Sequence, residues 1–223
     1  MNVEQARFNM IEQQIRPWDV LDAHVLDLLA VVRREDFVPA AHRALAFADL
    51  ELPLKPGEDA VARGQVMLAP RVEARMLQDL QLAKHEKVLE VGTGSGFMAA
   101  LLAHRARQVL TLEISETLAR LAQHNLQRAR IANVTVRHYD GSLGARGEAP
   151  FDAIVLSGSV AELPQSMLDL LKPGGRLMAI VGDEPVMRAT LVQHAGASLI
   201  STQPWDTCAP RLLNFPEPAR FRF

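Results

Sequence analysis

From about residue 72 onward, short apolar runs alternate with segments in which apolar residues recur every three or four positions. The short runs predict buried strands at 87–91, 151–156 and 177–180, and further strands at 109–113 and 134–138. The helical spacing predicts helices at 72–82, 97–102 and 115–126. Strands and helices that alternate in this way indicate an α/β fold built on a parallel, doubly wound sheet.

The first 55 residues follow a different pattern, which is helical. Asp19 is expected to cap a helix there. The apolar face of that helix comprises Leu21, Val25, Leu28, Leu29 and Val32. Prolines and glycines punctuate residues 52–70, which predicts a loop crossing from this helical cap to the α/β core. The tail, 219–223, alternates between apolar and polar residues as a terminal strand does.

Composition narrows the classes of function that fit the chain. Its 223 residues are 48% apolar, and a formal net charge of −2 argues against broad electrostatic binding of nucleic acid. No apolar run approaches the roughly 20 residues that span a bilayer, and the N-terminus lacks the order of a signal peptide. The single cysteine, Cys208, has no partner within the chain, and the histidines show no metal-ligand spacing. We therefore expect a cytoplasmic protein without a membrane segment or a metal site.

The segment from Val88 to Phe97 carries the most chemical information. A buried strand ends in glycines at alternate positions, Gly92, Gly94 and Gly96, and a helix follows. Glycines let the backbone approach a ligand closely, so a strand, a glycine turn and a helix N-terminus form a socket for a nucleotide-like molecule. A dinucleotide site requires G-x-G-x-x-G/A, and Phe97 occupies the third of those positions. An NAD-dependent dehydrogenase is therefore the weakest alternative.

The next two strands carry acidic residues where such a socket needs them. Glu113 ends a strand about 20 residues past the first glycine, where a doubly wound sheet places a carboxylate against a ribose diol. Asp140 and Gly141 follow the strand after that. Each acid also has a plainer explanation, Glu113 as a solvated strand end and Asp140 as a turn former. Their joint occurrence at these spacings favours the nucleotide site.

The order E-x-G-x-G-x-G over residues 90–96 resembles motif I of class I S-adenosylmethionine (SAM) methyltransferases. Further blocks resemble the protein-L-isoaspartate O-methyltransferase family in particular. These blocks are 10–16, 33–39, 45–54, 133–141, 149–154 and 171–177. The resemblance spans residues 8–182, and its cap half is the more specific part because many methyltransferases share the SAM half.

This resemblance implies a Rossmann-like α/β fold, doubly wound around a seven-stranded mixed sheet with an antiparallel strand near the C-terminal end. It also implies a helical cap with an acceptor-site loop over 1–71 and a SAM-binding domain over 72–223, packed as one unit. The cofactor would be SAM, with S-adenosyl-L-homocysteine as product. The residues expected to bind it are Glu90, Gly92, Thr93, Gly94, Ser95, Gly96, Glu113, Ile114, Asp140, Gly141 and Ser157. Glu90 and the glycines would hold its amino-acid end, Glu113 its ribose and Asp140 its adenine.

One block departs from the family. The family usually carries Gly-Gln-Thr-Ile-Ser-Gln-Pro-Tyr between cap and core, and its hydroxyls line the acceptor site. Residues 64–71 instead read Gly-Gln-Val-Met-Leu-Ala-Pro-Arg, so Val66 and Leu68 replace the hydroxyl residues. The acceptor site would be bordered by Gln65, Leu68, Pro70 and Arg71. Arg71 would pair with an acceptor carboxylate, unless it is a solvated residue in the first turn of the next helix.

The resemblance predicts a SAM-dependent O-methyltransferase that acts on the carboxylate of L-isoaspartyl (D-aspartyl) residues in damaged proteins or peptides. A carboxylate is already ionised at neutral pH, so methyl transfer requires alignment and a dry site rather than a base. The departure at 66–68 keeps a different acceptor open, either a small molecule or RNA. A SAM-binding adaptor without turnover also stays open. The sequence does not indicate the oligomeric state.

Overall fold

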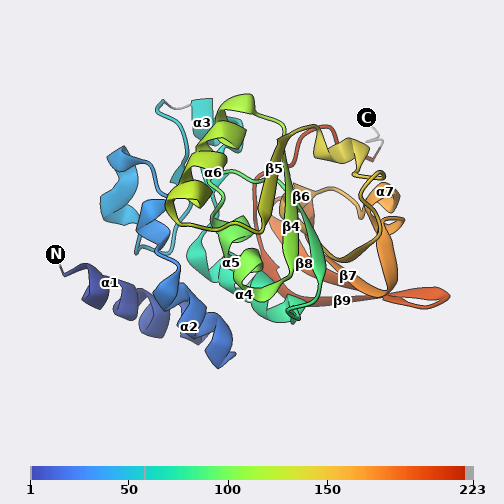
Figure 1. Cartoon of the computed structure of the whole chain (residues 1–223), viewed down its shortest axis with the longest axis horizontal. Coiled ribbons are helices and arrows are strands. Elements are labelled where there is room, and N and C mark those ends of the chain that lie inside the picture. Colours follow the sequence, from blue (N-terminus) through green and yellow to red (C-terminus); the bar gives the residue numbers. More distant parts are fainter. Residues whose placement is uncertain (1, 58, 219–223) are drawn as a thin grey trace.

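A seven-stranded mixed sheet lies at the centre of the computed structural model, which describes residues 2–57 and 59–218 (Figure 1). In spatial order its strands are β5 (Val134–His138), β4 (Gln108–Glu113), β3 (Lys87–Val91), β6 (Phe151–Val160), β7 (Leu171–Asp183), β8 (Val186–Ala195) and β9 (Ser198–Thr207). Neighbours from β5 to β7 pair in parallel, and β8 runs antiparallel to both β7 and β9. The predicted mixed sheet, with an antiparallel strand near its C-terminal end, is confirmed.

The central strands are buried on both faces. The helices of this part are α4 (Pro70–Leu80), α5 (Phe97–Arg105), α6 (Glu116–Arg128) and α7 (Gln165–Leu168). Val88 of β3 belongs to an apolar cluster with the cap and α4 to α6, whereas Leu89 belongs to a second cluster with α7 and Phe215. Because strand side chains point alternately to the two faces, one strand supplies both clusters. Burial on both faces explains why these strands read as continuous apolar runs.

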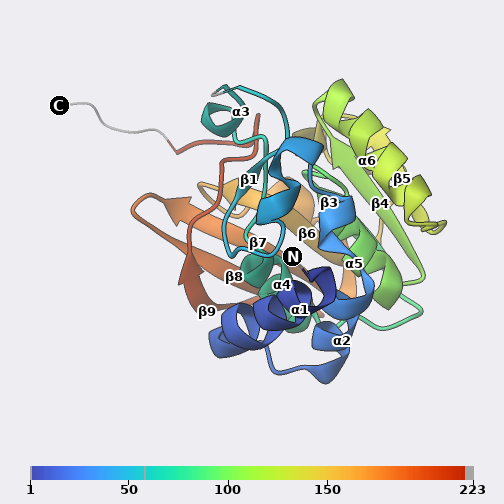
Figure 2. The ribbon, with the colours of Figure 1, turned by 90° about the vertical axis from the view of Figure 1, so that its left-hand side faces the viewer.

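The N-terminal part is helical, as predicted, and packs against α4 and α5 (Figure 2). Its elements are α1 (Val3–Met10), η1 (Ile11–Ile15), η2 (Arg16–Trp18), α2 (Ala23–Val31), η3 (Arg34–Asp36) and η4 (Ala40–Leu45). The prediction that Asp19 is the N-cap residue of this helix is wrong. Asp22 directly precedes α2 and accepts the backbone N–H of His24 over 2.8 Å, whereas Asp19 has a left-handed φ of 59°.

Residues 52–70 are more ordered than the predicted loop. They contain β1 (Leu52–Pro53), α3 (Asp59–Ala62) and β2 (Val66–Met67), and β1 pairs with β2 in antiparallel fashion. Strands of two residues are too short to produce a readable alternation, so this part of the prediction fails. In Figure 2 the segment that leaves β9 runs past α3, so two segments distant in sequence approach each other, and a Cβ on Gly64 would lie 2.8 Å from Pro210 Cβ.

Two predicted boundaries shift in the structure. The helix predicted at 72–82 begins at Pro70, since proline is favoured at the first helical position, and ends at Leu80, before the left-handed Gln81. The strand predicted to end at residue 156 continues to Val160, so Ser157 lies within β6 rather than after it. The terminal strand expected at 219–223 lies outside the described residues.

Candidate active site

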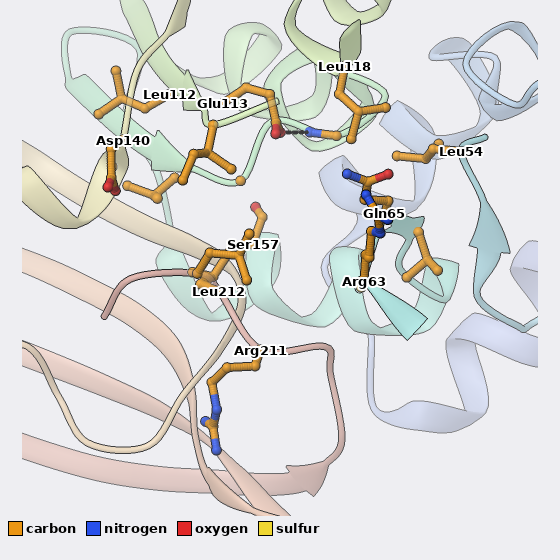
Figure 3. Close-up of a pocket in the computed structure, with 18 of the residues that line it drawn as sticks. Leu54, Arg63, Gln65, Leu112, Glu113, Leu118, Asp140, Ser157, Arg211 and Leu212 are labelled. Atoms are coloured by element: carbon orange, nitrogen blue, oxygen red, sulfur yellow. Dashed lines mark hydrogen bonds between the residues drawn. The ribbon is translucent and has the colours of Figure 1, made fainter. Parts of the chain in front are cut away.

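A cavity of about 660 Å³, including its open mouth, lies at the carboxyl ends of β3, β4 and β6 (Figure 3). The chain passes from β3 outward to β4 and β5 and then returns to β6 on the other side of β3. In open α/β sheets, ligands bind at such a reversal of strand order. The predicted residues that line this cofactor cavity are Gln65, Gly92, Gly94, Glu113, Ile114, Asp140, Gly141 and Ser157.

The glycine turn after β3 forms one wall of the cofactor cavity. Gly92 has φ of 93°, and a Cβ there would lie 3.0 Å from Leu212 Cδ2 and 3.2 Å from the carbonyl oxygen of Ser157. Gly96 has φ of 84° and directly precedes α5. Only glycine adopts these left-handed conformations without strain, so the motif is needed for the shape of the turn.

Glu113, at the end of β4, is held rigidly at the cofactor cavity. Its Oε2 accepts the backbone N–H of Gly94 over 2.9 Å, and its Oε1 accepts the N–H of Ser115 over 2.9 Å. Figure 3 shows the first of these bonds. Each carboxylate oxygen has two acceptor positions, so both oxygens keep one for a ligand. This arrangement suits a vicinal diol such as that of a ribose.

Asp140 lies across the cavity from the loop of Gln65 (Figure 3). Its Oδ1 accepts both the N–H and the hydroxyl of Ser142, over 3.0 and 2.7 Å. Its Oδ2 accepts the side-chain amide of Asn214 over 2.7 Å. Burial acts to raise the pKa of Asp140, but these hydrogen bonds lower it overall. The carboxylate therefore stays ionised, with Oδ2 free to accept one more donor, such as an exocyclic amine.

Glu90 does not line the cofactor cavity. It is fully buried and accepts hydroxyl protons from Thr111 over 2.7 Å and from Ser157 over 2.8 Å. Ser157 itself lines the cavity, so it separates Glu90 from any ligand there. Burial raises the pKa of Glu90 to about 8, although the two hydroxyls act against the shift. Direct contact between Glu90 and a cofactor stays a prediction, and the geometry favours an indirect role.

Three other predicted residues support the glycine turn from behind. Thr93 shares a hydrogen bond of 2.6 Å with the hydroxyl of Thr111. The hydroxyl of Ser95 accepts the N–H of Phe97 over 3.3 Å. A Cβ on Gly96 would lie 3.3 Å from the side chains of α6, so this glycine permits close packing of the turn. None of the three is among the residues that line the cavity.

The acceptor-site loop divides into a half-buried part and a buried part. Gln65 and Val66 line the cofactor cavity, whereas Leu68 and Pro70 are buried outside it. The carbonyl oxygen of Leu68 accepts Nη2 of the buried Arg34 over 2.8 Å. The loop is therefore anchored to the cap at Leu68, and Val66 is the substituted position that faces the cavity.

The structure places Arg71 in a different cavity. Its Nη1 pairs with Asp49, and its guanidinium carbon lies 4.4 Å from the centre of the Trp18 ring. Both residues line that second cavity with it, and none of them lines the cofactor cavity. Arg71 is thus the second residue of α4 with its charge already compensated by Asp49. Its predicted contact with an acceptor carboxylate stays a prediction.

The C-terminal part of the site was not predicted from the sequence. Arg211, Leu212, Leu213 and Phe215 line the cofactor cavity beside the glycine turn. Two backbone hydrogen bonds to Ser159 of β6 fix this segment. The N–H of Ser159 donates to the carbonyl of Pro210 over 2.7 Å, and the N–H of Leu212 donates to the carbonyl of Ser159 over 2.9 Å. No motif or periodicity in these residues marks them as part of a site.

The lining of the cofactor cavity combines apolar side chains with a few polar groups. Leu54, Val66 and Leu213 supply the apolar side chains, and Arg63 and Gln65 supply polar ones. Within 2–57 and 59–218, no three His, Cys, Asp or Glu side chains gather where they could hold a metal ion. In the same residues, every helix is too short or too polar to span a membrane.

Solved structures share this fold. One is a Plasmodium falciparum protein described as a protein-L-isoaspartate O-methyltransferase, in complex with S-adenosyl-L-homocysteine, with a TM-score of 0.77 and 20% identity. The match covers 92% of this chain and 97% of that one. Another is described as a protein-L-isoaspartate O-methyltransferase and has a TM-score of 0.78 and 22% identity. That match covers 92% of this chain and 65% of the other chain. At these identities the likeness shows the fold.

Sequence comparison extends the likeness to a family. Residues 5–208 match the family model of protein-L-isoaspartate(D-aspartate) O-methyltransferases. Protein-L-isoaspartate O-methyltransferase 1 of Syntrophobacter fumaroxidans is 39% identical over 193 residues, covering 86% of this chain and 87% of that protein. The Koribacter versatilis protein-L-isoaspartate O-methyltransferase is 38% identical over 202 residues, covering 91% and 87%. The chain therefore belongs to the protein-L-isoaspartate(D-aspartate) O-methyltransferase family.

Proposed function

We propose that this chain transfers a methyl group from SAM to the free carboxylate of L-isoaspartyl or D-aspartyl residues in damaged proteins and peptides. The observation that supports this most is the juxtaposition of Gly92, Gly94, Glu113 and Asp140 around one cavity. A diol-binding carboxylate and an amine-binding carboxylate on either side of a glycine turn suit a nucleoside with an amino-acid extension. Membership of the family supports the choice of acceptor.

The residues present fit SAM at both ends of the cavity. Glu113 has free acceptor positions for the two ribose hydroxyls, and Asp140 has one for the adenine amine. Gly92, with no side chain, lets Leu212 and the carbonyl of Ser157 approach the turn closely, and this turn lines the cavity where the amino-acid end would lie. Bound SAM supplies an electrophilic methyl group on a positively charged sulfur.

The acceptor enters on the side of Gln65 and Val66. An acceptor carboxylate is already ionised at neutral pH, so the protein need not remove a proton from it. The apolar side chains of Leu54, Val66 and Leu213 exclude water from the path of transfer, and Gln65 offers an amide donor for orientation. Alignment and dehydration are therefore the contributions expected from this chain.

The departure at Val66 supports a second candidate, a SAM-dependent methyltransferase with another acceptor. Val66 lines the cavity where the family carries a hydroxyl residue, so the acceptor pocket is more apolar than is usual in the family. A small apolar molecule with a nucleophilic oxygen would suit such a wall better than RNA, given the formal net charge of −2. A cytoplasmic location fits either candidate and rests on the use of a single, free cysteine.

The test is transfer of tritiated methyl from SAM to an isoaspartyl peptide and to its aspartyl twin. Labelling of the isoaspartyl peptide alone is the expected result. Tight SAM binding, measured by calorimetry, with no labelling of either peptide would overturn the proposed acceptor and favour the second candidate or a non-catalytic adaptor.

Two glutamate variants test whether SAM binds in the cofactor cavity. Glu113→Ala removes the carboxylate that accepts from Gly94 and Ser115, and SAM affinity should fall at least about tenfold, the equivalent of about 1.4 kcal/mol. Glu116→Ala is the matched control, because Glu116 is an exposed residue three positions on that pairs only with Arg120 of the same helix among the described residues. It should leave SAM affinity unchanged.

A further inference from the structure

Two arginines line the cofactor cavity, Arg63 and Arg211, and their charges are matched very differently. Arg211 pairs with Asp183 over 2.6 Å and with Glu217 over 3.0 Å. Arg63 has one ion-pair partner among the described residues, Asp59, at 3.8 Å, and the two side chains are 70% and 88% exposed. An ion pair that is so long and so open to water contributes little, so the charge of Arg63 is available to a ligand in the cavity.

The backbone around Arg63 is held by hydrogen bonds, although the side chain is open to solvent. Its N–H donates to the carbonyl of Asp59 over 3.0 Å, and the N–H of Gln65 donates to the carbonyl of Ala60 over 2.8 Å. The carbonyl of Gln65 in turn accepts the N–H of Leu54 over 2.9 Å. The side chain of Arg63 therefore extends from a fixed backbone position beside the cavity.

The loop that carries Arg63 lies over the glycine turn. A Cβ on Gly94 would lie 3.2 Å from Leu54 Cδ1 and 3.9 Å from the carbonyl oxygen of Val66. In Figure 3 Arg63 lies on the opposite side of the cavity from Asp140. Arg63 is therefore nearer to the part of the cavity proposed for the amino-acid end of SAM than to the part proposed for adenine. The methyl group would also lie on this side, because the sulfur that carries it joins the amino-acid chain to the ribose.

An anionic acceptor requires a cation in this cavity. The lining already contains two carboxylates, Glu113 and Asp140, whose charges repel a third. The loop also lacks the hydroxyl donors usual in the family, since Val66 and Leu68 replace them. A guanidinium presents paired N–H donors that match the two oxygens of a carboxylate, so Arg63 can supply both the charge and the hydrogen bonds.

We propose that Arg63 binds the carboxylate of the methyl acceptor and selects anionic acceptors over neutral ones. The inference rests on the proposed function and adds to it the residue that recognises the charge of the substrate. Arg71, the arginine that the sequence suggested for this role, pairs instead with Asp49 outside the cofactor cavity.

The change of charge during the reaction makes this contact weaker after transfer than before it. One acceptor oxygen forms a bond to the methyl carbon, the bond between that carbon and the sulfur breaks, and its electron pair stays on the sulfur. The acceptor carboxylate thereby becomes an uncharged methyl ester, and no proton is taken up or released. Arg63 holds the ester less tightly than the carboxylate, because the Coulomb attraction between the two charges is lost. Replacement of the product by a new acceptor is therefore favoured.

The test measures peptide binding by calorimetry on protein saturated with S-adenosyl-L-homocysteine, so that no transfer occurs. The ligands are an isoaspartyl peptide and the same peptide with its free carboxylate replaced by a carboxamide. The wild type should bind the carboxylate form about tenfold more tightly. Arg63→Gln should bind both forms with about equal affinity, and Arg63→Lys should retain most of the preference. In the transfer assay Arg63→Gln should raise KM about tenfold, with SAM affinity unchanged.

The matched control is Arg107→Gln, since Arg107 is an exposed arginine that directly precedes β4 and so lies at the edge of the sheet opposite the cofactor cavity. It should keep the full preference for the carboxylate. A preference that survives Arg63→Gln would overturn the assignment of Arg63 while leaving the proposed function intact. A loss of SAM affinity in Arg63→Gln would also overturn it, because Arg63 would then hold the carboxylate of SAM. No transfer to the isoaspartyl peptide by the wild type would overturn the proposed function itself.

Discussion

Arg34 and Glu73 form a buried ion pair between the cap and α4, with 2.6 Å between Nη1 and Oε2. The same guanidinium donates to the carbonyl of Leu68 and lies 5.3 Å from the centre of the Phe97 ring. One side chain thus ties the acceptor-site loop to the first residue of α5, directly after the glycine turn. The two halves of the site are held together through it.

Loss of this pair should be costly. Arg34→Ala leaves the Glu73 carboxyl buried without its partner, and breaking a buried ion pair costs about 3–5 kcal/mol. The free energy of unfolding in urea measures the effect. The double variant Arg34→Met with Glu73→Leu removes both charges and should recover more than half of the loss. A loss below about 1 kcal/mol in the single variant would show that water reaches Glu73.

Because the pKa of Glu90 is raised in the folded chain, the free energy of unfolding should fall as pH increases. Its pKa is about 8 in the folded chain against 4.5 as the ordinary value, so between these pH values the folded state holds a proton that the unfolded state has lost. The stability that Glu90 contributes is complete below pH 4.5 and is lost as pH rises to 8. Relative to Glu90→Gln, the wild type should lose about 1.4 kcal/mol per pH unit in this window.

Urea unfolding of both proteins at pH 5, 6.5 and 8 measures this difference. The carboxyl of Glu73, whose pKa burial raises to about 7, is present in both proteins. Because its charge also raises the pKa of Glu90, its contribution cancels only in part, and Glu73→Gln in both backgrounds removes the remainder. Parallel pH profiles for wild type and variant would show that Glu90 is ionised in the folded chain.

Gly141 should be irreplaceable beside Asp140 in the cofactor cavity. A Cβ there would lie 2.2 Å from Val91 Cγ1, and a β-branched core side chain has no alternative rotamer space to move into. Gly141→Ala should weaken SAM binding at least about tenfold. Gly147→Ala, with nothing within 4 Å of the added carbon, should bind SAM as the wild type does. Equal affinities for the two variants would mean that β3 and the turn move apart easily.

Restoring the family's hydroxyls should act differently at the two substituted positions. Val66 lines the cofactor cavity, so Val66→Thr places a hydroxyl where the proposed acceptor would lie, and kcat for an isoaspartyl peptide should rise about tenfold. Leu68 is only 6% exposed, so Leu68→Ser buries an unpartnered hydroxyl at a cost of about 1–3 kcal/mol without raising kcat. A gain in kcat from Leu68→Ser, and none from Val66→Thr, would contradict this placement.

Local patterns in the sequence predict the SAM-binding half of the fold well. β3 and β4 are mostly apolar runs, β5 alternates between apolar and polar residues, and Glu113 and Asp140 stand at or just past strand ends. Because parallel strands end at one edge of a sheet, knowing the strands is enough to bring these two acids to one cavity.

The rest of the site depends on contacts between distant segments. Leu212 meets Gly92 across 120 residues of sequence, and no periodicity encodes such a contact. Glu90 was predicted to hold the cofactor, but its place in the strand puts Ser157 between it and the cavity. Arg71 lies in the first turn of α4, which was one of the two alternatives, but its ion pair was beyond prediction because its partner Asp49 lies in a segment whose path the sequence does not reveal.

The cofactor cavity draws its wall from residues as far apart as Leu54 and Phe215. During synthesis, a chain that has reached only residue 205 already contains the glycine turn and both acidic residues, but it lacks the side chains that close the cavity. Such a chain has the chemistry of the site without its enclosure. Enclosure of the cavity is therefore a property that arises late, once the polypeptide extends through residue 215 and has folded back on itself.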